Sequence, residues 1–306
     1  MNNENPRDKF YITTAIDYIN GQPHIGHSYE KVAADVLARH YRRKLGNDNV
    51  LFVTGTDEHG AKIAKFAEQS ELAIEEFADQ TAALFRVAWD NLSVSYNRFI
   101  RTTEADHVKT VEEVITKIKD AGYLYEGDYE GLYCIGHEAF LTEKDLVDGI
   151  CPDHKAKPEL IKEKNWFFQV SKFTDTIRGK IESGEIAIYP EHSRKEILAM
   201  LNEGFNDIAV TRPNVSWGIP VPWDKSQTIY VWVDALINYY TAAKTAREIG
   251  GRDFWPADAH LIGPDIAKFH CIIWPAMLLA AELDMPKSVI VHGFLTLNNQ
   301  KISKSI

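Results

Sequence analysis

The hydrophobic and polar positions of the first 120 residues describe short buried strands that alternate with amphipathic helices. Runs of β-branched and aromatic residues predict strands at residues 9–16 and 50–53. Apolar residues at helical spacing predict three helices, over about 26–46, 74–91 and 104–121. This order favours an α/β fold with a parallel sheet and right-handed crossovers. Such sheets bind ligands beyond the carboxyl ends of their strands, so residues that follow the strands are the first candidates for a site.

The pattern changes after residue 122. From 123 to 170, short aromatic strands flank a loop with cysteines and histidines, which predicts an insertion within the α/β domain. Further strands are then predicted at 207–211, 228–233, 260–262 and 288–291. Further helices are predicted at 194–202, 235–247 and 265–283. We therefore divide the chain into a first half, 1–122, an inserted segment, 123–192, and a second half, 193–306.

The composition of the 306 residues fits a soluble globular chain of about two domains, or one large domain with an insertion. The formal net charge of −10 argues against binding mainly through unspecific phosphate contacts, since those need a basic face. Three cysteines are too few for a disulfide framework, which favours a reducing compartment such as the cytoplasm. The first residues lack a signal-peptide pattern, and the longest apolar run, 271–281, is far shorter than the ~20 residues of a membrane span, so no membrane partner is expected.

Two cysteine–histidine pairs lie within the inserted segment. Cys134 and His137 are three residues apart, as are Cys151 and His154. Four nitrogen and sulfur ligands match a closed tetrahedral zinc site, in which two thiolates neutralise the dication. The alternative is two unrelated cysteines and two surface histidines, but the repeated spacing within one short insert favours zinc. Because four protein ligands leave no open position, we expect a structural role and no part in the chemistry.

The tetrapeptide His-Ile-Gly-His at residues 24–27 begins the first predicted helix. Backbone N–H groups and the helix dipole at this end favour anions, and two imidazoles with a glycine between them suit a nucleoside triphosphate. Taken alone, the tetrapeptide is also consistent with one histidine bonded in the turn and one on the helix face. A metal site shared by His24 and His27, and completed by Asp57, is a further alternative.

A second polar motif, Lys-Ile-Ser-Lys-Ser, occupies residues 301–305. Its two lysines, Lys301 and Lys304, are mobile point charges that would hold a polyphosphate. In isolation, a solvated and charged terminus would show the same composition.

Together, these two motifs at opposite ends of a split α/β domain resemble the signatures of class I aminoacyl-tRNA synthetases. The chain between them resembles the methionyl branch of that class over residues 15–18, 55–60, 217–222, 230–235, 260–266, 269–270, 274–277 and 291–294. The resemblance extends over about residues 9–305 and implies a Rossmann-like nucleotide-binding domain. The inserted segment lies where that family has a zinc-bearing connective peptide, and the ligands would be Cys134, His137, Cys151 and His154.

The resemblance implies two adjoining substrate sites. The methionine pocket would be lined by Ala15, Ile16, Tyr18, Asp57, Trp232, Ala235, Tyr239 and His270. Asp57 would pair with the substrate ammonium, and Tyr18 or His270 would offer a donor to the polarizable sulfur. ATP would be bound by His24, Gly26, His27, Gly263, Asp265 and Lys304. The catalytic residues would be His24, His27, Lys301 and Lys304.

The reaction that the resemblance implies needs no nucleophile from the protein. The methionine carboxylate attacks the α-phosphorus of ATP, pyrophosphate leaves with Mg²⁺, and the adenylate passes methionine to the 3′ end of initiator and elongator methionine tRNA. Catalysis then depends on positioning and on stabilisation of the developing charge. The implied partners are therefore methionine, ATP and methionine tRNA, with Mg²⁺ and a structural zinc as cofactors.

The chain departs from the family pattern at three positions and at its end. Ile302 replaces a methionine, Leu236 replaces a proline, and Pro264 replaces a lysine beside the ribose site, which bears on ATP affinity. The family continues beyond the lysine motif into a stem-contact segment and a helical anticodon-binding domain, whereas this chain ends at Ile306. We expect a monomeric catalytic-domain fragment that retains amino-acid binding, with impaired activation and very poor tRNA charging.

Two other classes of function are compatible with parts of this pattern. A non-catalytic, synthetase-like module would bind methionine or nucleotide without reaction, but it has no need for the histidine and lysine motifs together. A metal hydrolase built on His24, His27, Asp57 and His59 explains neither the lysine motif nor the aromatic pocket. Methionine activation is the function that the motifs favour.

Overall fold

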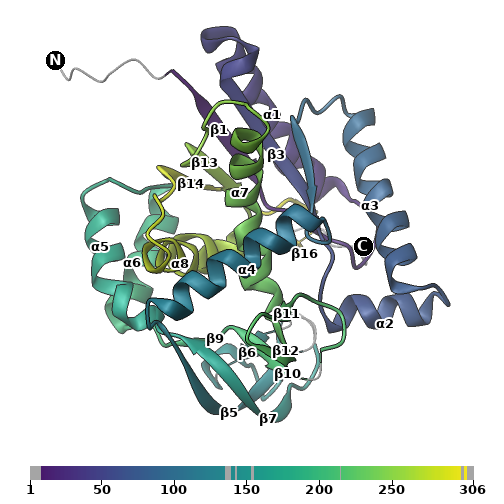
Figure 1. Ribbon diagram of the computed structural model, residues 1–306, viewed down its shortest axis with the longest axis vertical. Coiled ribbons are helices and arrows are strands. Elements are labelled where there is room, and N and C mark those ends of the chain that lie inside the picture. The colour runs from purple at the N-terminus through teal and green to yellow at the C-terminus, as the bar shows by residue number, and fades with distance from the viewer. Residues whose placement is uncertain are drawn as a thin grey trace.

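Seven strands form the central sheet of the computed structural model, which describes residues 8–134, 139–141, 143–152, 155–213, 215–297 and 300–301 (Figure 1). The strands are β1 (Phe10–Thr14), β2 (Asp17–Tyr18), β3 (Val50–Asp57), β4 (Arg98–Arg101), β8 (Ala187–Tyr189), β13 (Ala259–Ile262) and β14 (Ser288–Val291). All of their pairings are parallel, which confirms the parallel α/β sheet expected from the sequence.

The order of the strands reverses beside β1. This strand lies between β3 and β13, and the chain places β4 outside β3 on one side, and β14 and β8 outside β13 on the other. Loops that leave neighbouring strands at such a reversal run in opposite directions and open a crevice at the carboxyl ends of the strands. Ala15, Asp57, Gly263 and His292 lie at or directly after these strand ends.

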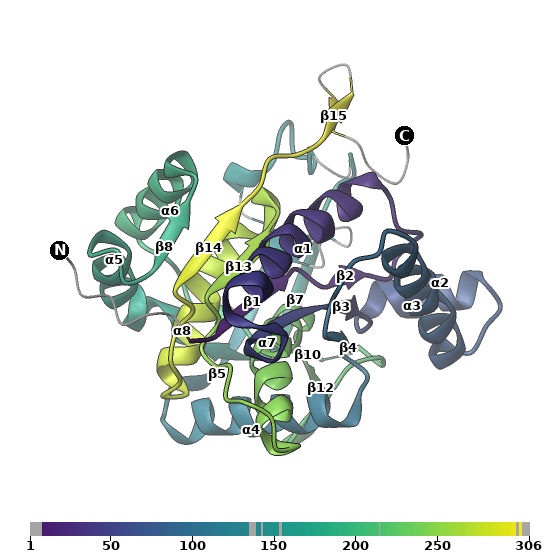
Figure 2. The same cartoon turned by 90° about the horizontal axis from the view of Figure 1, so that it is seen from above.

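Helices cover both faces of the sheet, as Figure 2 shows. Phe10 and Ile12 of β1 pack with α1 and α3, whereas Tyr11 between them packs with α7, because successive strand side chains point to opposite faces. Burial on both faces explains why these strands are nearly continuous apolar runs in the sequence. The helices are α1 (Ile25–Leu45), α2 (Ala61–Gln69), α3 (Ile74–Asn91), α4 (Ala105–Asp120), α5 (Thr174–Glu182), α6 (Glu191–Glu203), α7 (Val231–Glu248) and α8 (Trp274–Ala280).

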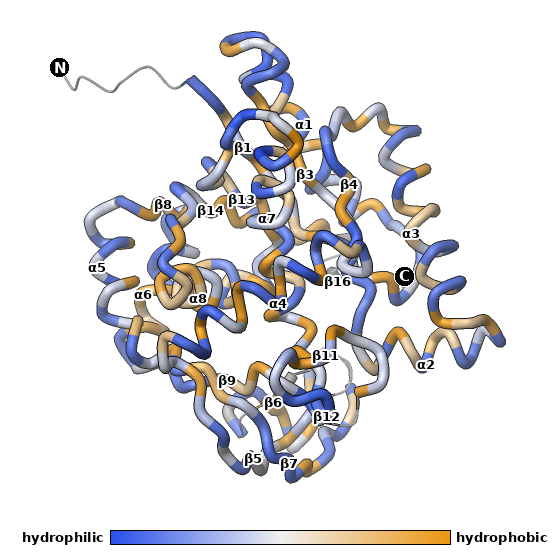
Figure 3. Tube along the Cα trace, viewed as in Figure 1, coloured by the Kyte–Doolittle hydropathy of each residue, from blue (hydrophilic) through white to orange (hydrophobic). Residues whose placement is uncertain are grey.

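Several predicted helices are confirmed. The prediction over 74–91 is α3 with the same bounds, and the prediction over 26–46 is α1, which ends where Gly46 adopts a φ of 90° and donates its N–H to the carbonyl of Arg42. Figure 3 shows α2 and α3 alternating between hydrophilic and hydrophobic residues, as amphipathic surface helices do. The sequence patterns missed α2, α5, β4 and β8.

Antiparallel strands form the rest of the structure. One sheet consists of β5 (Leu124–Cys134), β6 (Ala139–Leu141), β7 (Glu159–Phe168) and β9 (Ile208–Ala209). A smaller sheet consists of β10 (Thr211–Pro213), β11 (Pro220–Val221) and β12 (Asp224–Ile229). A hairpin pairs β15 (Thr296–Leu297) with β16 (Gln300–Lys301). Short 3-10 turns cover Asn47–Asn49, Glu143–Asp145, Val170–Phe173 and Pro264–Ile266.

The division of the chain at residues 122 and 192 stays a prediction, although two strand pairings cross it. Strand β8 belongs to the predicted insertion, yet Ile188 pairs with Val289 at the edge of the main sheet. Strand β9 belongs to the predicted second half, yet Ile208 pairs with Phe168 of the antiparallel sheet.

The strand predicted over 228–233 is wrong in its second half. Strand β12 ends at Ile229, and α7 begins at Val231, so Trp232 lies in the first turn of a helix. All but one of the first nine residues of α7 are buried. A segment in which nearly every residue is buried has no periodicity that separates a buried strand from a buried helix.

The single helix predicted over 265–283 is also wrong. The segment begins with the 3-10 turn at Pro264–Ile266, widens into a π-helix at Phe269–Ile273 and becomes α8 at Trp274. Pro275 has no N–H and its ring would crowd the carbonyl of Cys271 in a regular α-helix. The wider turn accommodates it, and the N–H of Trp274 reaches the carbonyl of Phe269, five residues back.

Within the described part of the chain, none of the helices combines the length and the apolar character needed to cross a lipid bilayer.

Candidate active site

The first turn of α1 is capped by two histidines. His24 is the N-cap, and its Nδ1 accepts the N–H of Gly26 at 3.1 Å, while His27 Nδ1 accepts the N–H of His24 at 3.1 Å. The two rings stack with centroids 3.8 Å apart. A side chain at Gly26 would place its Cβ 2.8 Å from the ring of His24, so this cap requires glycine between the histidines.

These hydrogen bonds select one tautomer of each ring. A neutral imidazole whose Nδ1 accepts a hydrogen bond has its proton on Nε2. Both rings therefore present Nε2–H donors at the positive end of the helix dipole, a combination that binds anionic oxygens. The phosphate-binding role predicted for His24, Gly26 and His27 stays a prediction, and the geometry supports it.

The loop after β13 faces the same crevice. Gly263 follows Ile262 directly, and a Cβ at this glycine would meet Asp265 Oδ1 at 2.8 Å and the ring of His292 at 3.9 Å. The close approach of these groups shows that the ends of β13 and β14 converge. Asp265 is exposed, so its carboxylate is accessible to a ligand hydroxyl.

A buried ion network that the sequence did not reveal ties α1 to the strand ends. Lys31 is 1% exposed, and its Nζ donates to the carbonyl of Ala15 at 3.0 Å, to Asp17 Oδ1 at 2.6 Å and to Glu30 Oε1 at 3.0 Å. His292 Nε2 lies 3.1 Å from the other oxygen of Glu30. The network therefore joins the segment after β1, the helix α1 and the end of β14.

The charges in this network reinforce one another. Burial alone would lower the pKa of Lys31, but the carboxylates of Asp17 and Glu30 outweigh it and raise that pKa. Burial alone would raise the pKa of Glu30, but Lys31 and His292 together lower it. The contact with Glu30 in turn raises the pKa of His292 against the effect of burial. The network thus favours the charged forms of Lys31 and Glu30 inside the protein.

Tyr239 and His270, two residues of the predicted methionine pocket, are hydrogen-bonded to each other. The hydroxyl of Tyr239 lies 2.7 Å from His270 Nε2, and His270 Nδ1 lies 3.0 Å from the carbonyl of Ile266. Since a carbonyl can only accept, Nδ1 has the proton and Nε2 accepts from Tyr239. Burial lowers the pKa of His270 to about 4, so the ring is neutral. In this arrangement His270 has no N–H left for a substrate sulfur, which leaves Tyr18 as the donor among the two that the sequence suggested.

Other predicted pocket residues lie on neighbouring elements. Trp232, in the first turn of α7, stacks on Phe269 of the π-helix with centroids 4.1 Å apart. Ala15 and Trp232 pack against the same core cluster as Tyr239, whereas Ile16 packs in a separate cluster. Ala235 is buried one turn further along α7.

Asp57 is the last residue of β3 and lies at the carboxyl ends of the parallel strands. Its backbone pairs with that of Tyr18 in β2, and 8% of the residue is exposed. Burial raises the pKa of the Tyr239 hydroxyl well above its usual value, and the nearby charges of Glu30 and Asp57 add to this shift.

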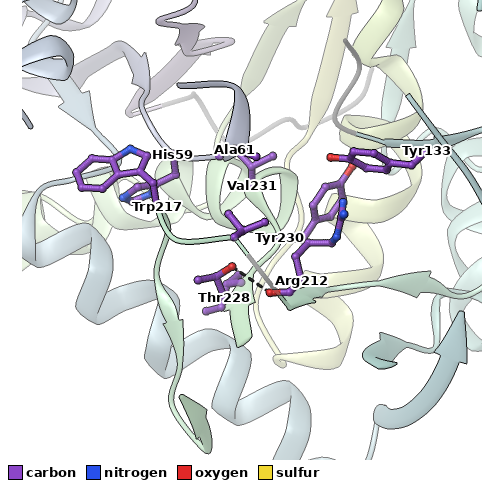
Figure 4. A pocket seen from close by; sticks show the side chains of 11 residues that line it. His59, Ala61, Tyr133, Arg212, Trp217, Thr228, Tyr230 and Val231 are labelled. Carbon is purple, nitrogen blue, oxygen red and sulfur yellow. Dashed lines mark hydrogen bonds between the residues drawn. The ribbon is translucent and has the colours of Figure 1, made fainter. Parts of the chain in front are cut away.

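Figure 4 shows a pocket that is distinct from the predicted methionine pocket. Its lining does not contain Asp57 or Trp232, although it includes their near neighbours His59 and Val231. Arg212 lies 4.1 Å from the ring centroid of Tyr133. The other labelled lining residues are Ala61, Trp217, Thr228 and Tyr230.

The predicted zinc ligands are described only in part. Cys134 ends β5 and Cys151 forms a backbone bridge with Ala156; both cysteines are buried. His137 and His154 lie outside the described residues, so the zinc site stays a prediction. Of the predicted lysines, Lys304 also lies outside them, and Lys301 is described only as part of strand β16.

The metal-hydrolase alternative gains no support from the structure. Its four residues, His24, His27, Asp57 and His59, are all described, and the described residues contain no group of three or more histidine, cysteine, aspartate or glutamate side chains placed to hold a metal ion. His59 is instead bound to the carboxylate of Asp234.

The fold and the site define a class of protein. The architecture is that of a Rossmann-like nucleotide-binding domain. Helices cover both faces of a parallel sheet, and the strand order reverses beside β1. A helix N-terminus that contains a glycine lies at the crevice formed by this reversal. The model of the family described as tRNA synthetases class I (M) matches residues 10–157 and 154–306. The chain belongs to this family, and the resemblance found in the sequence is confirmed.

Individual relatives agree with this assignment. The methionine–tRNA ligase of Thermotoga maritima is 44% identical over 307 residues, and that of Clostridium perfringens is 45% identical over 299 residues; each alignment covers 97% of this chain. The chain spans about half the length of these relatives, 48% and 46%.

Solved structures give the same result. Mycobacterium tuberculosis methionyl-tRNA synthetase in complex with methionyl-adenylate matches with a TM-score of 0.91 and 37% identity, over 98% of this chain and 60% of that one. Its apo form matches with a TM-score of 0.79 and 35% identity, over 94% of this chain and 56% of that one.

Proposed function

We propose that this chain contains the site that activates methionine with ATP, and that as part of a longer protein it charges methionine tRNA in the cytoplasm. The observation that carries the proposal is the pair of Nε2–H donors on His24 and His27 at the first turn of α1, the helix that Lys31 ties to the carbonyl of Ala15 directly after β1. The similarity to Mycobacterium tuberculosis methionyl-tRNA synthetase in complex with methionyl-adenylate supports it.

In the proposed reaction, a carboxylate oxygen of methionine forms a bond to the α-phosphorus of ATP. The bond from this phosphorus to the bridging oxygen breaks, and pyrophosphate leaves. His24 and His27 donate to phosphate oxygens as their negative charge shifts, and Lys301 and Lys304 are proposed to do the same from the second motif. Mg²⁺ would offset the charge of the departing pyrophosphate, mainly through the substrate's own oxygens.

The amino acid would be held by groups of opposite character. Asp57 would pair with the ammonium group, while the aromatic rings of Trp232 and Tyr239 would contact the thioether. Gly263 and Asp265 would contact the ribose. The adenylate would then transfer methionine to the terminal adenosine of the tRNA.

Methionine-dependent exchange of pyrophosphate into ATP tests this proposal on the chain itself. We expect exchange that depends on methionine and that falls about 10²–10³-fold in the His27→Ala variant, because one preorganised donor to the phosphates is lost. A chain extended to the full length of the relatives serves as a positive control. Methionine binding with no exchange in either chain would support the non-catalytic module instead, and no binding would overturn both.

We also propose that Cys134, His137, Cys151 and His154 hold one structural zinc. The buried positions of both cysteines support this, since thiolate ligands of a closed site are shielded from water. We expect elemental analysis to find about one zinc per chain, lost in the Cys134→Ser, Cys151→Ser double variant and retained in His24→Ala. Loss of zinc in the His24 variant, or its retention without both thiolates, would place the metal elsewhere.

A further inference from the structure

A buried aspartate on α7 joins two histidines from other parts of the chain. Asp234 is 1% exposed; its Oδ2 lies 2.6 Å from His59 Nδ1 and its Oδ1 lies 2.7 Å from His107 Nε2. His107 is fully buried, and 6% of His59 is exposed. Burial alone would raise the pKa of Asp234, but its two histidine partners lower it. The group is thus a carboxylate that holds one imidazole on each oxygen.

The members of this cluster lie close in the sequence to residues of the proposed methionine site. His59 lies two residues after Asp57, and Asp234 lies two residues after Trp232. The bond between His59 and Asp234 therefore ties the loop after β3 to the first turn of α7. These two segments contain the proposed partners of the substrate ammonium and of its sulfur-bearing tail.

The third element of the cluster is α4. His107 contacts Asp234 through Nε2 and Thr241 through Nδ1, at 3.0 Å, so one imidazole spans two turns of α7. The two α7 residues are seven apart and lie on the same face of that helix. This double contact fixes both the position and the rotation of α7 against α4.

The residue between Asp57 and His59 is anchored independently. Glu58 is fully buried and accepts hydrogen bonds from Arg101 Nε at 2.7 Å and from Thr103 Oγ1 at 2.6 Å. Both partners belong to the segment that leads into α4. The loop after β3 is therefore held through Glu58 to the segment that precedes α4, and through His59 to α7.

We propose that Asp234 is a positioning residue for methionine binding, which sets the separation between Asp57 and Trp232 through its contacts with His59 and His107. This rests on the proposed function and extends it to a residue that does not itself touch the substrate. A misplacement of about 1 Å in such a pocket is enough to cost roughly 10²-fold in reactivity.

The substitution Asp234→Asn tests the proposal with little change in volume. An amide has one acceptor oxygen and one NH₂ group, so it can hold only one of the two imidazole N–H donors. We expect the KM for methionine in the exchange reaction to rise about 10–100-fold, with the KM for ATP changed less than about threefold.

Asp258→Asn provides the matched control. Asp258 is also a buried carboxylate that accepts hydrogen bonds from the N–H of Tyr11 at 2.8 Å and from Nζ of Lys287 at 2.9 Å. It precedes β13, however, and so lies at the amino-terminal ends of the strands, away from the proposed site. We expect a lower melting temperature and an unchanged KM for methionine. A rise of the methionine KM in both variants would mean that loss of any buried carboxylate produces the effect, and would overturn the proposal.

If Asp234→Asn does not fold, a second pair of variants tests the positioning role of Asp234. His107→Gln retains a donor for Asp234 and is expected to keep the methionine KM within about threefold, whereas His107→Leu is expected to raise it. Equal methionine KM values in both variants and in the unchanged chain would overturn the positioning role while leaving the proposed function intact. Absence of methionine-dependent exchange in the unchanged chain would instead refute the proposed function.

Discussion

The Lys31→Met variant is expected to lose about 3–5 kcal/mol of unfolding free energy, the typical cost of removing one partner from a buried ion pair. Lys31 is 1% exposed and supplies the hydrogen bonds that hold Asp17 and Glu30 inside the protein. Methionine fills a similar volume but leaves two buried carboxylates without their cation. Urea denaturation followed by circular dichroism would measure the loss.

The pH dependence of this loss distinguishes electrostatics from packing. The lowered pKa of Glu30 means that the pair with Lys31 contributes its full stabilisation above the ordinary pKa of 4.5. This contribution declines below 4.5 and is lost as the pH falls through the lower pKa of the folded state. The deficit of Lys31→Met should therefore be larger at pH 7 than at pH 4. Lys109→Met, on an exposed lysine 4.0 Å from Glu113, is the control and should change stability by less than about 0.5 kcal/mol. A deficit that does not vary with pH would show that Lys31 acts through packing alone.

The Asp57→Asn variant is expected to lose methionine affinity by about 2–5 kcal/mol, or roughly 30- to 4,000-fold in Kd. Asp57 is the carboxylate proposed to face the substrate ammonium, and it is largely buried at the end of β3. An ionic contact in such a site loses its Coulomb attraction when the carboxylate becomes an amide. Isothermal titration with methionine would measure the change.

A substrate analogue makes this test specific. Methionine without its amino group should bind weakly to the unchanged chain, and Asp57→Asn should bind it about as well as the unchanged chain does. Such non-additivity is the signature of a direct contact between the two groups. Asp258→Asn should bind methionine as the unchanged chain does. Equal discrimination against the analogue by both chains would show that Asp57 does not hold the ammonium.

Local signals explain which parts of the fold were predictable. Helix α1 has a histidine cap at His24 and a glycine at its end, Gly46, and α3 has a regular apolar stripe. The π-helix around His270 and the helical start at Val231 were not predictable in this way. Both lie in runs that are buried on every side, where hydropathy no longer distinguishes one secondary structure from another.

The residues of the candidate site also fall into those that the sequence indicated and those that it did not. Its motif residues His24 and His27 were found because they lie next to a recognisable turn and helix start, whereas Gly263 was found through the resemblance to the family. The clusters around Lys31 and Asp234 were not, since their members come from elements far apart in the chain: Glu30 and His292 are separated by 262 residues. No pattern along the chain indicates that two such residues will meet.

The sequence alone determined the parallel α/β architecture, the family and the motifs at the strand ends, because these depend on signals that extend over only a few neighbouring residues. Only the tertiary structure decided the tautomers of His24 and His270, the ion network of Lys31 and the link from His59 through Asp234 to His107. Those features depend on which strands are adjacent and which helix faces meet. They are selected because a charged or polar group buried away from water costs free energy unless it is paired with a hydrogen-bonding or ionic partner.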